Sequence, residues 1–321
     1  MHIRRNFLLA LSAAALLSPL ARRTAAQAYP ARPVRLLVGF PAGGPNDILG
    51  RLIAEWLGAK LGQPFVVDNL PGSAGNIATE AVVRAAPDGY TLLLAGPANA
   101  ISGSLGQNLG FNFLRDIAPV GGITREALVM VVHPSVPAAS AKEFIAHATA
   151  QRLRIASTGN GSSPHVTGEL FKQMSGVDLE VVHYAGGGPA LKAMIAGEAQ
   201  TMFEPMSAAI VPIKSGVLRA LAVTSAARSP ALPDVPTLAD TIAGFEASAA
   251  TGIGAPKDTP AEIIATLNAA INAAFADPAM SARLAETGGV PLPGSPAEFG
   301  RLMAAETEKW GKVVRAAARA R

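Results

Sequence analysis

The sequence of 321 residues contains no cysteine, and only 5% of its residues are aromatic. The absence of cysteine excludes disulfide bonds, thiol nucleophiles, zinc sites built on thiolates and a lipid anchor attached through cysteine. It does not by itself fix the redox compartment. Half of the residues are apolar, so the chain is able to bury a large core, and its length suits about two domains.

Common enzyme motifs are missing as well. No stretch reads G-x-x-x-x-G-K-[ST], which excludes a Walker loop, and no serine lies in G-x-S-x-G or in S-x-x-K. H-E-x-x-H is absent, and Gly159 and Gly161 do not complete the pattern G-x-G-x-x-G. We therefore expect a binding protein with no catalytic residue, no metal and no cofactor.

The first 28 residues have the pattern of an export signal. Arg4 and Arg5 form a positive start, a short apolar stretch follows, and Ala26-Gln27-Ala28 offers a cleavage site before Tyr29. The apolar stretch is too short to span a bilayer comfortably. The two arginines are followed by Asn-Phe-Leu, which is typical of a twin-arginine signal, and both that route and the Sec route stay open. We expect export to the periplasm and a mature chain that begins at Tyr29.

The formal charge changes once this signal is set aside. The full chain carries a net charge of +4, but residues 1–28 contain four arginines and no acidic residue, so the remainder is neutral. A neutral chain lacks the basic surface on which nucleic-acid binding depends, and we expect no nucleic-acid partner. No later apolar run is long enough to span a membrane, and we expect a soluble monomer.

Apolar runs of strand length alternate with runs of helical periodicity along the rest of the chain. Residues 34–40 predict a strand and residues 48–61 a helix, and the same order returns further along. This alternation indicates an α/β fold with mostly parallel sheets and helices on both faces. Breaks in the pattern predict two domains, one formed by residues 29–126 and 252–321, the other by residues 127–251.

Glycine-rich loops follow several of the predicted strands. They cover residues 41–46, 71–75, 96–99, 157–164 and 185–188. Loops after parallel strands converge on one crevice, where ligands bind. None of these loops contains Lys or Arg, while several offer Ser, Thr, Asn and backbone N–H groups. A single such loop is more often only a tight turn, but together they predict a site for a small carboxylate, because phosphates more often recruit Lys or Arg.

Three side chains near these loops have more than one interpretation. Asp47 lies in the first turn of a predicted helix, where it stabilises the helix, orders the loop before it, or meets an amine of a ligand. His165 is a polar first-turn residue or a ligand hydrogen bonder, and a nucleophilic pair with Ser162 has no evident third member. Glu204 follows a short strand, and its place in the cleft or as a cap of a neighbouring turn stays open.

The stretch YPARPVRLLVGFPAGGPND at residues 29–47 resembles the mature N-terminus of Bug-type solute receptors. These are the extracytoplasmic binding components of tripartite tricarboxylate transporters. The likeness continues through LGQPFVVDNLPGSAGN at 61–76, ASTGNGSSPHVTGELFKQMSGVDL at 156–179 and LRALAVTSAARSPALPDVPTLAD at 218–240. It implies a two-domain periplasmic binding protein, type II-like, with a ligand cleft between domains that close without chemistry.

This resemblance also implies the ligands and partners. Typical ligands of the family are di- and tricarboxylates, acidic amino acids and aromatic acids, which the receptor delivers to permease subunits in the membrane. A sensor that feeds a signalling system is an alternative, and a secreted hydrolase using Ser162 and His165 is a remote one. The sequence departs from the family pattern at Glu204, where Asp is usual, and between His183 and Tyr184, where proline is missing.

The candidate ligand-binding residues combine the loops with the positions that match the family. They are Phe40, Pro41, Ala42, Gly43, Gly44, Asp47, Gly96, Asn99, Ser157, Gly159, Gly161, Ser162, His165, Tyr184 and Glu204.

Overall fold

The computed structural model describes residues 29–105, 109–286 and 288–319, so the predicted export signal lies outside the described residues. Its strands are β1 (Val34–Val38), β2 (Phe65–Asn69), β3 (Thr91–Ala95), β4 (Ile117–Val132), β5 (Leu153–Ser157), β6 (Leu179–His183), β7 (Thr201–Pro205), β8 (Arg219–Val223), β9 (Ser248–Pro256) and β10 (Gly289–Pro291). Its helices are α1 (Pro45–Leu61), α2 (Asn76–Val83), α3 (Pro97–Ser102), α4 (Phe113–Asp116), α5 (Ala141–Ala150), α6 (Ser163–Ser175), α7 (Gly187–Ile195), α8 (Met206–Lys214), α9 (Ala261–Ala276), α10 (Pro278–Glu286) and α11 (Pro296–Arg319), with short 3-10 turns at Ser73–Gly75 and Leu238–Asp240.

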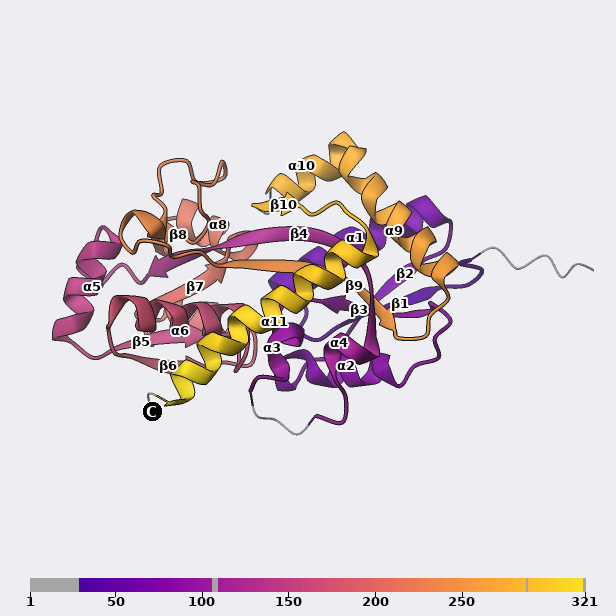
Figure 1. Ribbon diagram of the computed structural model, residues 1–321. Helices are drawn as coiled ribbons and strands as arrows, with labels where there is room; N and C mark the ends of the chain where they lie inside the picture. The colour runs from indigo at the N-terminus through magenta and orange to yellow at the C-terminus, as the bar shows by residue number, and fades with distance from the viewer. Residues whose placement is uncertain (1–28, 106–108, 287, 320–321) are drawn as a thin grey trace, which may run out of the picture.

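The strands form one curled sheet in the order β2-β1-β3-β9-β4-β7-β5-β6, and β8 and β10 also pair with β4 (Figure 1). At the two ends of the sheet the strands are parallel, since β1 pairs in parallel with β2 and β3, and β5 pairs in parallel with β6 and β7. In the middle they are antiparallel, through β4 and β9. The predicted α/β architecture is confirmed, but the sheet is mixed rather than mostly parallel.

The two ends of the sheet define two lobes. The first lobe holds β1, β2 and β3 with the helices around them, and the second holds β5, β6, β7 and β8 (Figure 1). β4 leaves the first lobe and β9 returns to it, so the two strands run in opposite directions and pair over most of β9. From Leu128 onward β4 pairs with β7 and β8 instead, which makes it a member of both lobes. The change of partner on β4 lies between Ala127 and Leu128.

The strand β9 was not predicted, and its composition explains why. It reads SAATGIGAP, with small residues where a typical strand has β-branched or aromatic ones. Small residues are required by close packing, because a Cβ atom on Gly252 would lie 2.3 Å from the carbonyl oxygen of Gly121 and 2.4 Å from Cζ of Phe299. The backbone of β9 is thus sandwiched between β4 and α11.

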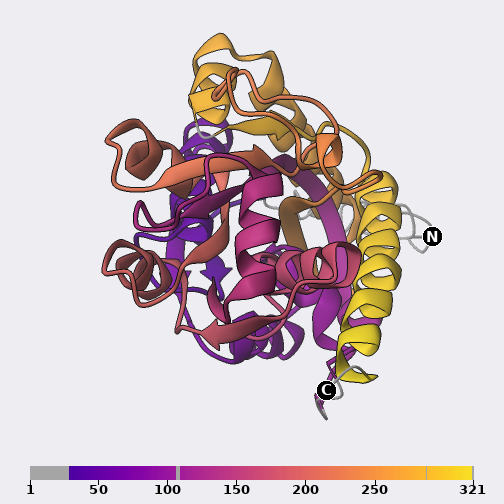
Figure 2. The ribbon, with the colours of Figure 1, turned by 90° about the vertical axis from the view of Figure 1, so that its left-hand side faces the viewer.

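Helix α11 packs on both lobes (Figures 1 and 2). Its first turns place Phe299 and Met303 in a core cluster of the first lobe. Further along, Trp310 and Val313 join the main core cluster of the second lobe. The indole N–H of Trp310 donates to Oε2 of Glu306 at 2.6 Å, so this buried polar pair satisfies itself within the helix. The C-terminal helix therefore connects the lobes in addition to β4 and β9.

Local signals in the sequence set several helix starts. Ser140 caps α5, and its hydroxyl accepts the N–H of Glu143 at 3.2 Å. Helix α9 begins directly after Pro260, and α10 begins at Pro278. Among the described residues no single helix is both long enough and apolar enough to cross a membrane, and α9 with α10 reach that length only as a pair bent by 81°.

Substitution of Gly252 by alanine tests the close packing of β9 against β4 and α11. We expect Gly252→Ala to destabilise the protein by about 1–3 kcal/mol, because a backbone carbonyl and a buried ring have to move aside. Urea unfolding followed by circular dichroism measures this change. Gly103→Ala is the matched control, since a Cβ there meets nothing within 4 Å. Equal stability of the two variants would contradict the packing described for β9.

Candidate ligand-binding site

A cleft lies between the two lobes, and the starts of five helices line it. The contributing residues are Gly44, Pro45 and Asn46 at α1; Gly96, Pro97, Ala98 and Asn99 at α3; Ser162, Ser163 and Pro164 at α6; Gly187, Gly188 and Pro189 at α7; and Pro205 before α8. The first N–H groups of a helix have no partner within the helix, and the helix dipole places positive charge there. The cleft is therefore built to receive negative charge.

The sequence makes these helix starts compact. Proline occupies one of the first two positions of α1, α3 and α6, where its missing N–H removes no helical hydrogen bond. Glycine precedes α1, α3 and α7 as the cap residue, so no cap side chain separates the backbone from the cleft. The cleft opens to solvent at its mouth, and its lining comes from both lobes.

No basic side chain lines this cleft among the described residues, as the loop sequences predicted. The nearest arginine on α1, Arg51, is half exposed and pairs with Asp47 at 2.9 Å, away from the cleft. Uncharged residues, many of them proline, alanine and glycine, therefore form most of the lining. The ionisable lining residues are two acids, Glu126 and Glu204.

Glu204 lies in the cleft rather than capping a turn, which settles the alternative left open by the sequence. It stands on β7 opposite Val129 of β4 and is 1% exposed. Neither of its carboxyl oxygens has a hydrogen-bond partner. Burial and the neighbouring charge of Glu126 raise the pKa of Glu204 well above its ordinary value. A charged carboxyl without a partner is costly to bury, so the raised pKa favours the neutral form of this side chain.

Glu126 is the second acid of the cleft and was not predicted. It lies on β4 and accepts the backbone N–H of Ser207 at the start of α8. Burial raises the pKa of Glu126 to about 7, although the hydrogen bonds from Ser207 act in the opposite direction. The signal that could have identified it is an acidic residue just ahead of the buried apolar run at residues 128–132.

Asp47 orders the loop before α1. Its Oδ2 accepts the N–H of Gly43 at 2.9 Å and Nε of Arg51 at 3.0 Å, and the side chain is buried. Burial alone would raise the pKa of Asp47, but the hydrogen bonds from Arg51 and Gly43 together lower it. Gly43 itself is exposed with a φ of +81°, and neither residue lines the cleft. Of the three roles considered for Asp47, the structure favours loop ordering.

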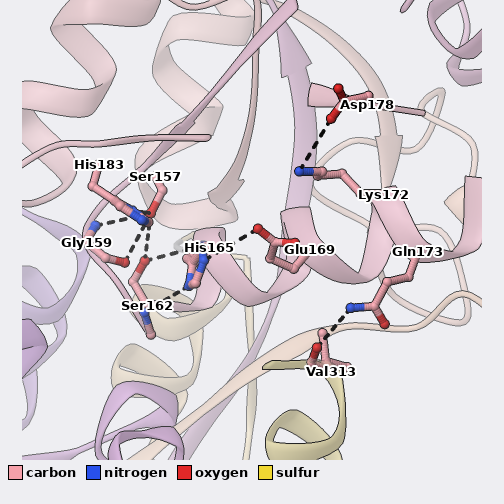
Figure 3. Close-up of polar contacts among 11 residues, drawn as sticks. Ser157, Gly159, Ser162, His165, Glu169, Lys172, Gln173, Asp178, His183 and Val313 are labelled. Atoms are coloured by element: carbon pink, nitrogen blue, oxygen red, sulfur yellow. Dashed lines mark hydrogen bonds and ion pairs between the residues drawn. The ribbon is translucent and has the colours of Figure 1, made fainter. Parts of the chain in front are cut away.

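Ser162 and His165 do not form a nucleophilic pair (Figure 3). The Ser162 hydroxyl accepts the backbone N–H of His165 as the cap of α6, and Nδ1 of His165 accepts the N–H of Gly161 at 3.0 Å. Ser157 contacts Nδ1 of His183 at 3.1 Å and accepts the N–H of Gly159. These contacts fix the loop that ends at α6, and the hydrogen bond that joins Ser162 to His165 uses the backbone N–H of His165.

The predicted site residues fall into three groups. Those that line the cleft are Phe40, Pro41, Ala42, Gly44, Gly96, Asn99, Ser162 and Glu204. Gly159 and Tyr184 line a neighbouring cavity that Phe40 and Pro41 also border. Gly43, Asp47, Ser157, Gly161 and His165 line neither cavity, and the contacts described above show that they hold the loops in place. The cleft is also lined by Thr158, Ser163, Gly187 and Gly188, which lie in the predicted loops, and by Thr251, which lies outside them.

The two lobes touch at the edge of the cleft. A Cβ atom on Gly186 would lie 3.0 Å from Cδ of Pro41, and one on Gly187 would lie 3.3 Å from Cδ of Pro45. These glycines precede and begin α7 of the second lobe, while the prolines belong to the loop and first turn of α1 in the first lobe. Only a residue without a side chain fits such an approach without displacing its neighbour.

Comparison with known proteins identifies the family in which this arrangement is found. Residues 49–318 match the sequence model described as Tripartite tricarboxylate transporter family receptor. The chain belongs to this receptor family. Protein BugT of Bordetella pertussis is 36% identical over 92% of both chains. A protein of R. palustris solved with adipate has 35% identity and a TM-score of 0.87, covering 90% of this chain and 98% of its own.

Other solved receptors agree with this assignment. The periplasmic binding protein BugD has 30% identity and a TM-score of 0.86, covering 90% of this chain and 99% of its own. MatC of Rhodopseudomonas palustris, solved with bound malate, has 31% identity and a TM-score of 0.82, covering 89% of this chain and 100% of its own. The family and its solved members are receptors of the periplasmic binding protein class rather than enzymes.

Replacement of Asp47 by asparagine tests its role in this receptor. We expect Asp47→Asn to lower the free energy of unfolding at pH 7 by about 1–2 kcal/mol, because the charged hydrogen bond to Arg51 is weakened. Since the folded pKa of Asp47 is lowered, this stabilisation is complete above the ordinary aspartate pKa of about 3.9 and is lost as the pH falls through the folded value.

Urea unfolding of wild type and variant over an acidic to neutral pH series measures this difference. Asp68→Asn is the control, because the Asp68–Arg35 pair is exposed and contributes little. A difference between wild type and Asp47→Asn that stays constant down to the lowest pH would contradict the charged role.

Proposed function

We propose that this protein is a periplasmic receptor that captures a small carboxylate in the cleft and delivers it to the membrane subunits of a tripartite transporter. The observation that carries the proposal is the set of five helix starts around a cleft without a basic side chain. Relatives solved with adipate and with malate support the ligand class. Phe40, Gly44, Asn46, Gly96 and Ser162 are the positions from which we expect the carboxylate to be held.

We also propose how the cleft closes. The lobes correspond to residues 29–126 with 252–321 and to residues 127–251, and they would move about the crossover strands β4 and β9. The contacts of Gly186 and Gly187 with the first lobe would form when the ligand is enclosed. We expect residues 1–28 to direct export and the mature receptor to act as a monomer, with the ligand left chemically unchanged.

A ligand panel tests the receptor function. The mature chain, unfolded and refolded to remove any carried ligand, is heated with dicarboxylates, hydroxy acids, amino acids and aromatic acids in turn. Because a ligand at about 100 times its Kd stabilises the folded state by about 2.7 kcal/mol, we expect one or more acids to raise Tm by several degrees. Chromatography afterwards should recover that acid unaltered. No shift with any acid, or consumption of the acid, would contradict the proposal.

Gly187→Val tests the edge of the cleft. The added side chain meets Pro45 and keeps the lobes apart, so we expect the affinity for the acid found in the panel to fall by about tenfold or more, or about 1.4 kcal/mol. Calorimetry measures the affinity, and thermal unfolding without ligand should be unchanged. Gly103→Val is the control, since its position is open. Wild-type affinity in Gly187→Val would show that this contact is not part of binding.

A further inference from the structure

Two histidines contact the loop at residues 157–162, which reaches the cleft through Ser162 (Figure 3). His165 lies in the first turn of α6, and its Nδ1 accepts the backbone N–H of Gly161 at 3.0 Å. His183 ends β6, and its Nδ1 lies 3.1 Å from Oγ of Ser157. The two rings meet edge to face, with their centroids 4.8 Å apart. Both ends of the loop are therefore attached to a side chain that is able to titrate.

The contact with Gly161 defines the protonation state of His165. A ring nitrogen that accepts a hydrogen bond carries no proton, so the ring is neutral and its proton lies on Nε2. Nε2 lies 3.8 Å from Oε1 of Glu169, one turn further along α6, and both side chains are only 5% exposed. A carboxyl beside Nε2 favours the proton on that nitrogen, which leaves Nδ1 as the acceptor for Gly161.

Gly161 depends on this acceptor because its surroundings are tight and buried. Its φ is +86° and that of Gly159 is +123°, so the loop has a backbone conformation that few residues adopt. A Cβ atom on Gly161 would lie 2.5 Å from Cδ1 of Leu105, which leaves little room for the backbone to move toward α3. A buried N–H that loses its acceptor is costly, so loss of the Nδ1 lone pair would displace the loop.

The titratable groups that face the ring of His165 among the described residues are few. Glu169 lies on α6 itself and His183 on β6. On α11 the carboxyl of Glu306 is buried and accepts the indole N–H of Trp310. The core cluster that includes α6 is otherwise apolar, with these contributions from the elements packed on the helix: Ile155 of β5, Phe203 of β7, Ile101 of α3 and Val313 of α11.

We propose that His165 is a positioning residue that holds the loop at residues 157–162 in its binding conformation only while its ring is neutral, so that protonation of His165 releases Gly161 and weakens ligand binding. This inference rests on the proposed receptor function and adds a pH response to it. An imidazolium has a proton on both nitrogens, so Nδ1–H would face the N–H of Gly161 and two donors would meet.

The new charge on His165 has a second effect, of opposite sign. A positive ring attracts an anionic ligand, whereas a displaced loop removes the start of α6 from it. Because His165 does not line the cleft, its charge acts from behind the loop, while Ser162 and Pro164 border the ligand space directly. We therefore expect the displacement of the loop to prevail, and the sign of the pH response distinguishes the two effects.

Two substitutions of His165 test the proposal by titration calorimetry. His165→Asn keeps an oxygen near the place of Nδ1 and does not titrate, whereas His165→Leu removes the acceptor. Each protein is titrated with malate, with adipate and with any acid found in the panel, from about pH 8 to about pH 5, around the ordinary histidine pKa of about 6.5. We expect wild-type affinity to fall by about tenfold relative to His165→Asn over this range, and His165→Leu to bind weakly throughout.

The ratio of wild type to His165→Asn isolates the effect of this ring. The pKa of Glu126, raised by burial to about 7, lies in the same range, and its protonation favours an anion at low pH. That effect is common to both proteins and cancels in the ratio. His147→Asn is the matched control, because His147 lies on α5 outside both cavities and this variant should follow the wild-type curve. A ratio that stays constant to pH 5 overturns the inference and leaves the receptor function intact.

Nuclear magnetic resonance of the ligand-free receptor, labelled with ¹⁵N, tests the same proposal without a ligand. At about pH 8 we expect the ring of His165 to carry its proton on Nε2. At about pH 5 the amide of Gly161 should exchange with solvent about tenfold faster in wild type than in His165→Asn. A proton on Nδ1 at the higher pH, or equal exchange in the two proteins, overturns the inference. Absence of binding by every acid contradicts the receptor function, and these spectra then decide the role of His165 alone.

Discussion

One constraint shapes the rest of this structure: the backbone at the starts of five helices has to line the same cleft. Backbone donors are positioned by the fold, and no long basic side chain has to be ordered to provide them. This requires small or proline residues where each helix begins, as Gly44, Pro45, Gly96 and Gly187 show. It also requires that strands from both lobes end at the same place, which the parallel ends of the sheet provide.

The middle of the sheet determines how the lobes are connected. β4 pairs with β9 as far as Ala127 and with β7 and β8 from Leu128 onward, so these strands carry the chain between the lobes. Helix α11 adds a third connection, because Phe299 lies in a first-lobe cluster and Trp310 in a second-lobe cluster. Movement of the lobes therefore has to preserve both ends of α11 or shift the helix relative to one of them, which restricts the directions in which the cleft can open.

The alternation of strands and helices, the glycine-rich loops and the lack of basic lining residues followed from the sequence because each depends on local pattern. β9 could not be predicted, because its small residues are required by packing against Phe299, which lies about fifty positions away in the chain. His165 was a candidate because its position matches the family pattern, and in the structure Nδ1 of its ring accepts the N–H of Gly161. Glu126 was missed because it lies inside a long strand, where loop patterns carry no information.

The coexistence of helix starts and buried acids in one cleft has a consequence for selectivity. Helix starts alone would accept any small carboxylate of suitable size, because they recognise charge rather than the rest of the molecule. A buried carboxyl without a partner disfavours every ligand that offers it no hydrogen bond. Selectivity then comes from weaker binding of those ligands. Since Glu204 lies on β7 and the α1 start lies across the cleft, a ligand satisfies both only by spanning the lobes. Recognition and closure would then be the same event, because the ligand group that hydrogen-bonds to the Glu204 carboxyl reaches it when the two lobes meet.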